Sequence, residues 1–304
     1  MANLRLIKKR VLSIKNIGKM TKALEMVSAS KVTKAQTQAL NAKPYANAIY
    51  ELVNNLATNI EYSEIPLLKI PKDINSCLYI VISTNRGLVG SLNTNLFKYL
   101  SSRLSERKGI KYKFASLGRK ARNFCLLNGE LIADFSNDLD FSSKINSIVR
   151  LINNGFLEKE FDEVFVVYPE FINALNQIPH IKKILPITKA SLEEEKKLEH
   201  FEILGEIQVS KFQKTEYINY FLEPDRIQVL NYLLPFYLEV QIAEAFYEAC
   251  ASEHSARMVA MKNATESTKE LSDNLTLEYN KERQSLITNE INDITLAQVS
   301  LNIK

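Results

Sequence analysis

Tryptophan is absent from this sequence, and glycine, proline and cysteine are scarce. The 304 residues include only 8 glycines, 8 prolines and 3 cysteines. Few glycines argue against an all-β protein, which needs many tight turns, and favour long helices. The cysteines, Cys77, Cys125 and Cys250, are too far apart for a disulfide framework or a zinc pattern, which fits a reducing compartment. No apolar run approaches the roughly 18 residues that a membrane-spanning helix needs.

Groupings of catalytic or metal-binding residues are also missing. His180, His200 and His254 are isolated, and no second ligand follows at helical spacing. No local pairing of a nucleophile with a base stands out. We therefore expect no catalytic residue, no metal and no cofactor.

One loop raises an alternative. Residues 85–91 (NRGLVGS) follow a predicted strand and precede a predicted helix, which is where phosphate-binding loops lie. The loop lacks the third glycine of GxGxxG and the Gly-Lys-Ser/Thr of nucleoside triphosphate sites. The spacing favours a tight turn, with a nucleotide-binding enzyme as the alternative.

Charge is distributed unevenly along the chain. The total is +4, but residues 1–43 contain ten basic residues and one acidic residue, whereas residues 226–304 contain seven basic and eleven acidic residues. The basic end is compatible with an organelle presequence, a nucleic-acid-binding arm, or a helix docked on an acidic partner. No aromatic residue is interleaved before Tyr45 and no DNA-binding motif is present, so we expect no nucleic acid partner.

Both ends of the chain are predicted to be helical. Residues 3–60 carry apolar residues at coiled-coil spacing, followed by a stripe of small residues; Gly18 weakens this helix and Pro44 is predicted to kink or break it. Residues 236–304 contain neither glycine nor proline. A continuous helix of that length spans roughly 100 Å and must bury its apolar face on a partner. The basic first helix is the natural candidate, paired antiparallel.

The middle of the chain alternates between strand and helix patterns, which predicts an α/β sheet. Helices are predicted over residues 93–106, 118–127 and 145–154. Strands are predicted over residues 77–83, 111–117, 130–135 and 161–168, the last ended by Pro169, with an edge strand over 180–186. Residues 191–206 are dense in charge and are predicted to be a solvated loop or helix face.

These patterns give three predicted parts: a coiled-coil helix over residues 1–65, an α/β domain over 66–222, and a second coiled-coil helix over 223–304. The predicted fold is an antiparallel coiled coil of the two terminal helices with an inserted, Rossmann-like α/β domain.

Five blocks of the sequence resemble one protein family, the gamma subunits of F-type ATP synthases. The blocks are residues 14–31 (IKNIGKMTKALEMVSASK), 85–93 (NRGLVGSLN), 221–225 (FLEPD), 252–265 (SEHSARMVAMKNAT) and 279–290 (YNKERQSLITNE). The resemblance covers nearly the whole chain in order. It implies a non-catalytic rotor subunit of the central stalk, which transmits rotation of the membrane c ring to the catalytic β subunits for ATP synthesis coupled to ion flow.

The resemblance also implies partners and contact residues. The expected partners are the α and β subunits of the catalytic hexamer, the epsilon subunit and the c-subunit ring. Contacts with the hexamer would involve Leu24, Arg257, Arg283, Gln284, Thr288 and Glu290, with Lys15, Lys19, Lys22 and Lys31 on or near that surface. Tyr220, Glu223 and Asp225 would belong to the foot near epsilon and the c ring. The resemblance begins almost at Met1 and lacks the redox-cysteine insertion of chloroplast gamma subunits, so we expect a peripheral protein on the cytoplasmic face of a bacterial membrane.

Overall fold

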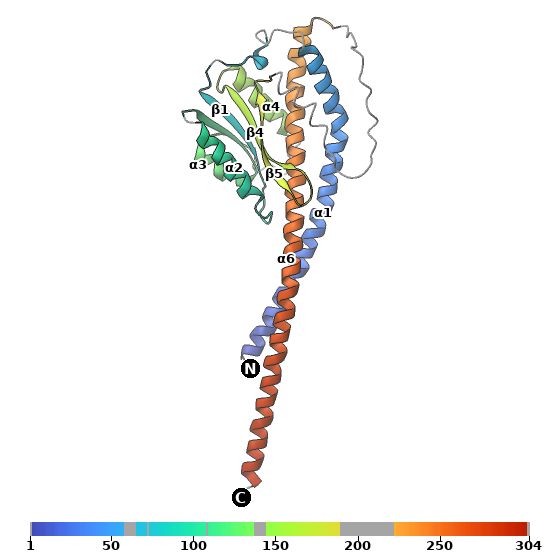
Figure 1. Ribbon diagram of the computed structural model, residues 1–304, viewed down its shortest axis with the longest axis vertical. Coiled ribbons are helices and arrows are strands. Elements are labelled where there is room, and N and C mark those ends of the chain that lie inside the picture. The colour runs from blue at the N-terminus through green and yellow to red at the C-terminus, as the bar shows by residue number, and fades with distance from the viewer. Residues whose placement is uncertain are drawn as a thin grey trace. The chain divides into compact units, whose positions relative to one another are not determined.

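The first and last elements of the chain are two long helices, and a five-stranded sheet with shorter helices lies between them in sequence (Figure 1). The computed structural model describes residues 2–57, 65–71, 73–107, 109–136, 144–188 and 222–302. The helices are α1 (Ala2–Ala57), α2 (Leu92–Glu106), α3 (Arg119–Asn128), α4 (Ile145–Leu157) and α6 (Arg226–Asn302), with a 3-10 turn, η1, at Pro66–Leu68. The strands are β1 (Ser76–Ile82), β2 (Lys111–Leu117), β3 (Glu130–Asp134), β4 (Glu163–Phe171) and β5 (Gln177–Leu185). The charged stretch predicted at residues 191–206 lies outside the described residues.

The chain divides into two compact units. The terminal pair contains residues 1–30 and 257–304, and the α/β unit contains residues 31–256. Each long helix contributes one segment to each unit. The three-part boundaries near residues 65 and 222 remain a prediction.

The sheet has the order β3-β2-β1-β4-β5. The first four strands in this order are parallel, and β5 pairs antiparallel with β4 as an edge strand. The predicted α/β fold between two long helices is therefore confirmed. The prediction that Pro169 ends its strand is wrong, because β4 continues to Phe171. Pairing of β1 with β4 stops at Val167, so no strand on that side requires an N–H donor from residue 169.

Alternate residues of each strand build two cores, one on each face of the sheet. On one face, Tyr79, Phe114 and Phe165 pack under α2 and α3. On the other face, Leu78, Ile80 and their neighbours pack against α4, against residues 46–57 of α1 and against residues 230–249 of α6. The inner ends of the long helices are therefore part of the core of the α/β unit.

A charged cluster is buried at the start of β4. Glu163 is 2% exposed, and its two carboxylate oxygens accept from Arg107 Nη1 at 2.5 Å and from Lys183 Nζ at 2.6 Å. The Cys77 thiol donates to the same carboxylate at 3.6 Å. Burial opposes ionisation of Glu163, but the bonds from the two cations outweigh it and lower its pKa.

Helix α1 passes through Pro44 without a break, so the predicted break there is wrong. Proline removes one helical hydrogen bond and leaves the carbonyl of residue 40 without its donor. Pro44 and Leu40 are both exposed, so water can satisfy that carbonyl, while Ala46 and Ile49 hold the following turn in the core. Packing on one side and solvent on the other keep the helix continuous.

Candidate functional site

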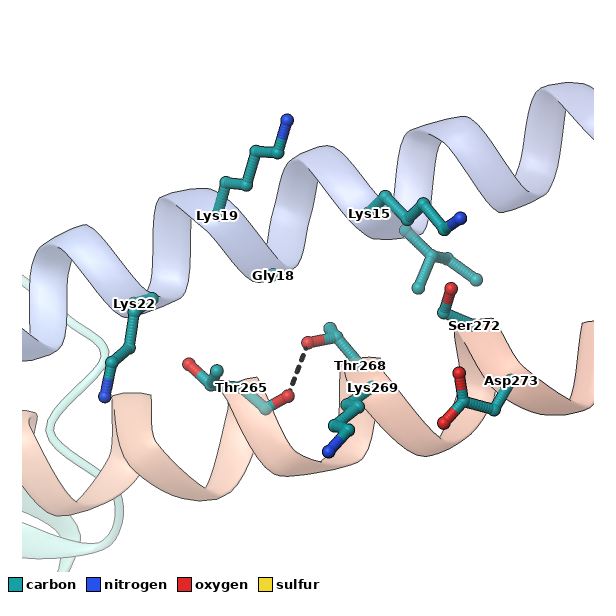
Figure 2. A pocket seen from close by; sticks show the side chains of 10 residues that line it. Lys15, Gly18, Lys19, Lys22, Thr265, Thr268, Lys269, Ser272 and Asp273 are labelled. Carbon is teal, nitrogen blue, oxygen red and sulfur yellow. Dashed lines mark hydrogen bonds between the residues drawn. The ribbon is translucent and has the colours of Figure 1, made fainter.

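The terminal pair is an antiparallel crossing of α1 and α6 built from small and hydroxyl side chains (Figure 2). Gly18 faces Thr268, and a Cβ placed on Gly18 would lie 3.0 Å from Thr268 Oγ1. One turn further along α1, the Thr21 and Thr265 hydroxyls share a hydrogen bond of 2.8 Å. The residue numbers rise on one helix as they fall on the other, which establishes the antiparallel direction predicted from the sequence.

Two hydroxyl protons serve three short contacts at this crossing. One threonine donates to the other, and the second donates to the preceding turn of its own helix: Thr21 to the Gly18 carbonyl at 3.1 Å, or Thr265 to the Met261 carbonyl at 2.8 Å. Such bonds to the preceding turn let a polar side chain sit between helices without an unsatisfied group. The sequence shows the small-residue stripe but not this pairing, because the two threonines are 244 residues apart.

A basic groove runs along the crossing. It has a volume of about 540 Å³ and is lined by Lys15, Lys19, Lys22 and Lys269, with Asp273 at one end. Figure 2 shows Lys19 pointing away from α6, so the positive charge extends onto the outer surface of α1. Lys22 is bound to Glu25 at 2.9 Å. Exposed ammonium groups of this kind attract acidic partners over a Debye length of about 8–10 Å, and each such contact is weak and reversible.

Helix α6 continues beyond α1. Since residue 18 faces residue 268, one-for-one antiparallel spacing brings the start of α1 opposite about residue 284 of α6. Figure 1 shows α6 running on past the N-terminus. From residue 287 to residue 296 every residue is exposed, including Ile287, Ile291, Ile294 and Leu296 at 45–68%.

Ile287, Ile291 and Ile294 follow helical spacing and form one apolar stripe, and Leu296 lies on the opposite side. An apolar stripe of this kind exposed to water is typical of a surface that binds another protein. This is the strongest indication of function in the structure.

Four of the six residues predicted to contact a hexamer lie on or beside this exposed end. Arg283, Gln284, Thr288 and Glu290 are exposed on α6, and the Thr288 hydroxyl donates to the Gln284 carbonyl at 2.9 Å. Arg257 is half-buried at the inner end of the terminal pair.

The remaining predicted contact residues are more dispersed. Leu24 is half-buried on α1, and its carbonyl accepts from the Ser28 hydroxyl at 2.7 Å. Lys15, Lys19 and Lys22 come together in the groove, whereas Lys31 belongs to the α/β unit.

Two of the three predicted foot residues, Glu223 and Asp225, lie just before α6. Glu223 and Asp225 are exposed, and Asp225 Oδ1 accepts from the Gln228 backbone N–H at 2.8 Å. Asp225 therefore caps the helix, a local role that its position before the apolar run signals in the sequence. Tyr220 lies outside the described residues.

The glycine-containing loop after β1 is held by its own side chains. The Thr84 hydroxyl donates to the Arg86 carbonyl at 2.7 Å, and the Asn85 amide oxygen accepts from the Arg119 N–H, at the start of α3, at 3.1 Å. Leu88 and Gly90 have positive φ values of 64° and 57°. These bonds and backbone angles form the tight turn that the spacing predicts.

Among the described residues, no group of histidine, cysteine and acidic side chains could hold a metal ion, and no helix is long and apolar enough to cross a membrane.

Known proteins resemble this chain along its full length. The family model described as ATP synthase matches residues 3–301. An ATP synthase gamma chain of Chloroflexus aurantiacus is 36% identical over 308 residues, covering 99% of each chain. One from Methylacidiphilum infernorum is 37% identical, covering 99% of this chain and 100% of its own.

Solved structures agree on the fold. A chain in the OSCP/F1/c-ring structure of the Euglena gracilis mitochondrial ATP synthase superposes with a TM-score of 0.65 at 20% identity, covering 99% of this chain and 95% of that chain. A chain of the Tetrahymena thermophila central stalk and c ring gives a TM-score of 0.57 at 20% identity, covering 81% of this chain and 99% of the other.

Proposed function

Because this chain belongs to the ATP synthase gamma chain family, we propose that it turns inside a hexamer of α and β subunits as the central-stalk rotor. It is a non-catalytic subunit of an F-type ATP synthase. It transmits rotation of the membrane c ring to the catalytic β subunits, which use that rotation for ATP synthesis coupled to ion flow.

One observation supports this proposal most directly. Residues 287–296 of α6 continue as a helix beyond the reach of α1 and expose isoleucine and leucine side chains. A surrounding ring of subunits would cover every side of such a helix. We assign Arg283, Gln284, Thr288 and Glu290 to contacts with this ring, together with Leu24 and Arg257.

The chemistry of the surface suits a rotor. A shaft transmits work only if its contacts with each β subunit differ between rotor angles, so that each angle favours one conformation of the catalytic site. The basic groove at Lys15, Lys19 and Lys22 offers contacts that acidic loops can form and break, because exposed ion pairs are each worth about 0–1 kcal/mol. Strong contacts would hold the rotor at one angle.

The segment that leads into α6 would face the membrane. We assign Tyr220, Glu223 and Asp225 to the foot that contacts epsilon and the c ring. The protein would be peripheral, on the cytoplasmic face of a bacterial membrane, associated with the bilayer through the complex.

Co-expression with α and β subunits from the same organism tests this function. Native mass spectrometry should find one copy of this chain per hexamer, and ATPase activity should appear only in the assembled particle. A chain that never joins the hexamer would contradict the rotor function.

Substitutions then test the contact surface. Arg283→Ala should lower ATP-driven rotation or coupled synthesis by about tenfold or more, since hydrogen bonds to charged groups contribute about 1.5–3 kcal/mol. The matched control is Lys281→Ala, which removes the same charge two residues away and about 200° around the helix. Equal losses from both substitutions would argue against a specific role for Arg283.

A further inference from the structure

One face of α6 carries a carboxyl group where the surrounding positions are buried. Ala245, Ser252 and Ser255 are 0–1% exposed and follow the helical spacing that faces the sheet. Glu248 occupies the same stripe, between Ala245 and Ser252. It therefore points into the junction between α6 and the sheet, inside the α/β unit.

The junction is the attachment of the β4–β5 hairpin to α6. The Ser252 hydroxyl donates to the Pro169 carbonyl at 2.9 Å, and the Ser255 hydroxyl donates to the Ala174 carbonyl at 3.0 Å. Phe171 packs beside these bonds in a small core with residues of both long helices. Two hydroxyl bonds and one aromatic side chain thus hold the hairpin next to Glu248.

Glu248 is half-buried, and one of its two carboxylate oxygens lacks the partner that a buried oxygen requires. Its Oε2 is closed to solvent and accepts no hydrogen bond within the described chain. Glu170 of β4 and Glu244, one turn earlier on α6, repel a negative charge at this position, and Lys182 of β5 attracts one. Two carboxylates against one ammonium disfavour ionisation in addition to the cost of burial.

The other ionisable groups near the junction do not reverse the excess of negative charge around Glu248. The Tyr50 hydroxyl of α1 donates to Glu244. His180 Nδ1 lies 3.6 Å from Glu170. Burial lowers the pKa of His180, opposed by Glu170, so near neutral pH it adds little positive charge.

We propose that Glu248 is carried as a neutral carboxylic acid between α6 and the β4–β5 hairpin, and that loss of its proton loosens the attachment of the hairpin to the helix. The hairpin is then a proton-sensitive contact between the α/β sheet and the long C-terminal helix. This inference does not depend on the rotor function.

The expected pH range follows from the same surroundings. Burial, then Glu170 and Glu244, raise the pKa of Glu248 from 4.5 to about 8. An acid whose pKa is raised on folding binds its proton more tightly in the folded chain. Stability therefore falls as pH rises from about 5 to about 8, and the loss is complete above the folded pKa.

The test compares the full chain with its Glu248→Gln variant, which keeps the shape of the neutral acid. The unfolding equilibrium constant is measured by denaturant titration at several pH values between about 6 and 8. In the wild type this constant should rise about tenfold more per pH unit than in E248Q, which is the signature of one linked proton. Glu266→Gln, at an exposed position on the same helix, should keep the wild-type slope.

Two further measurements show which part of the chain responds to loss of the Glu248 proton. Both use the wild-type chain and so do not require E248Q to fold. Hydrogen exchange of the wild-type β5 amides should accelerate relative to α2 amides over the same pH range, after correction for intrinsic exchange. Infrared difference spectra of the wild type should show one protonated carboxylic acid that titrates near pH 8 and whose midpoint falls in Glu170→Gln. Equal slopes for wild type and E248Q, or no such carboxylic acid at pH 7, would overturn the proposal.

Discussion

Replacing both cations around Glu163 with methionine should destabilise the α/β unit by about 3–5 kcal/mol, the cost of leaving a buried charge unpaired. The Glu163 side chain is 3% exposed, whereas those of Arg107 and Lys183 are 40% and 35% exposed. Removing the cations therefore traps a carboxylate away from water, with only the weak Cys77 thiol as donor. Removing Glu163 instead leaves two cations that can reach solvent, and costs less.

Because removing the two cations costs more than removing Glu163, a rescue experiment is possible. Arg107→Met/Lys183→Met should lower the melting temperature by on the order of 10 °C, and adding Glu163→Gln should recover most of the loss, because the triple variant has no buried charge. Arg103→Met, which lies on α2 four residues before Arg107, removes an exposed cation and should leave the melting temperature unchanged.

The stability of the wild type and of the double variant should also depend differently on pH. The wild-type carboxyl group has a lowered pKa, so it contributes stability above its ordinary value of 4.5 and loses that contribution as pH falls through the folded pKa. The double variant lacks the bonds that lower this pKa, so its deficit should shrink in acid as Glu163 takes up a proton. A triple variant as unstable as the double, or a deficit that grows in acid, would refute the account.

Three further predictions concern the crossing helices and one turn, each measured by thermal and denaturant unfolding. Thr265→Val removes the hydroxyl bond to Thr21 and should cost about 0.5–1.5 kcal/mol, with Thr265→Ser as the control that keeps the hydroxyl. Gly18→Leu should separate the helices at Thr268 and destabilise the terminal pair. Gly18→Ala combined with Thr268→Ala, which removes the hydroxyl that a new Cβ would meet, should be at least as stable as the wild type. The reason is that alanine favours helix over glycine by about 1 kcal/mol. Gly118→Ala should destabilise the α/β unit strongly, by more than about 2 kcal/mol, since φ is +97° and the new Cβ would meet a backbone oxygen at 2.2 Å; unchanged stability would contradict the observed turn.

The elements that local pattern governs were predictable from the sequence. The strand predicted over residues 111–117 coincides with β2, and the edge strand predicted over 180–186 overlaps β5. Short apolar runs between turn residues specify buried strands well. The long helices followed from the scarcity of breakers. Pro44 in α1 and Pro235 in α6 are the exceptions, since both helices continue through them.

Contacts between distant residues were not predictable in this way. Glu163 lies 56 residues from Arg107 and 20 from Lys183, so a strand pattern gives no sign of their ion pairs. The same is true of Thr21 and Thr265, which only the antiparallel register brings together. Of the predicted contact residues, the exposed end of α6 supports those near residue 284 by geometry, whereas Leu24 and Arg257 rest on the family resemblance.

The exposed C-terminal end of α6 also affects how much of this chain a cell can synthesise without its partners. A copy made without a hexamer to enter presents Ile287, Ile291, Ile294 and Leu296 to every other chain in the cell. Surplus copies are expected to aggregate or to be degraded, since a partner that binds only the folded chain also protects it. If the proposed hexamer encloses this helix, synthesis of this chain has to be matched to that of the hexamer subunits, and its abundance should fall when they are depleted.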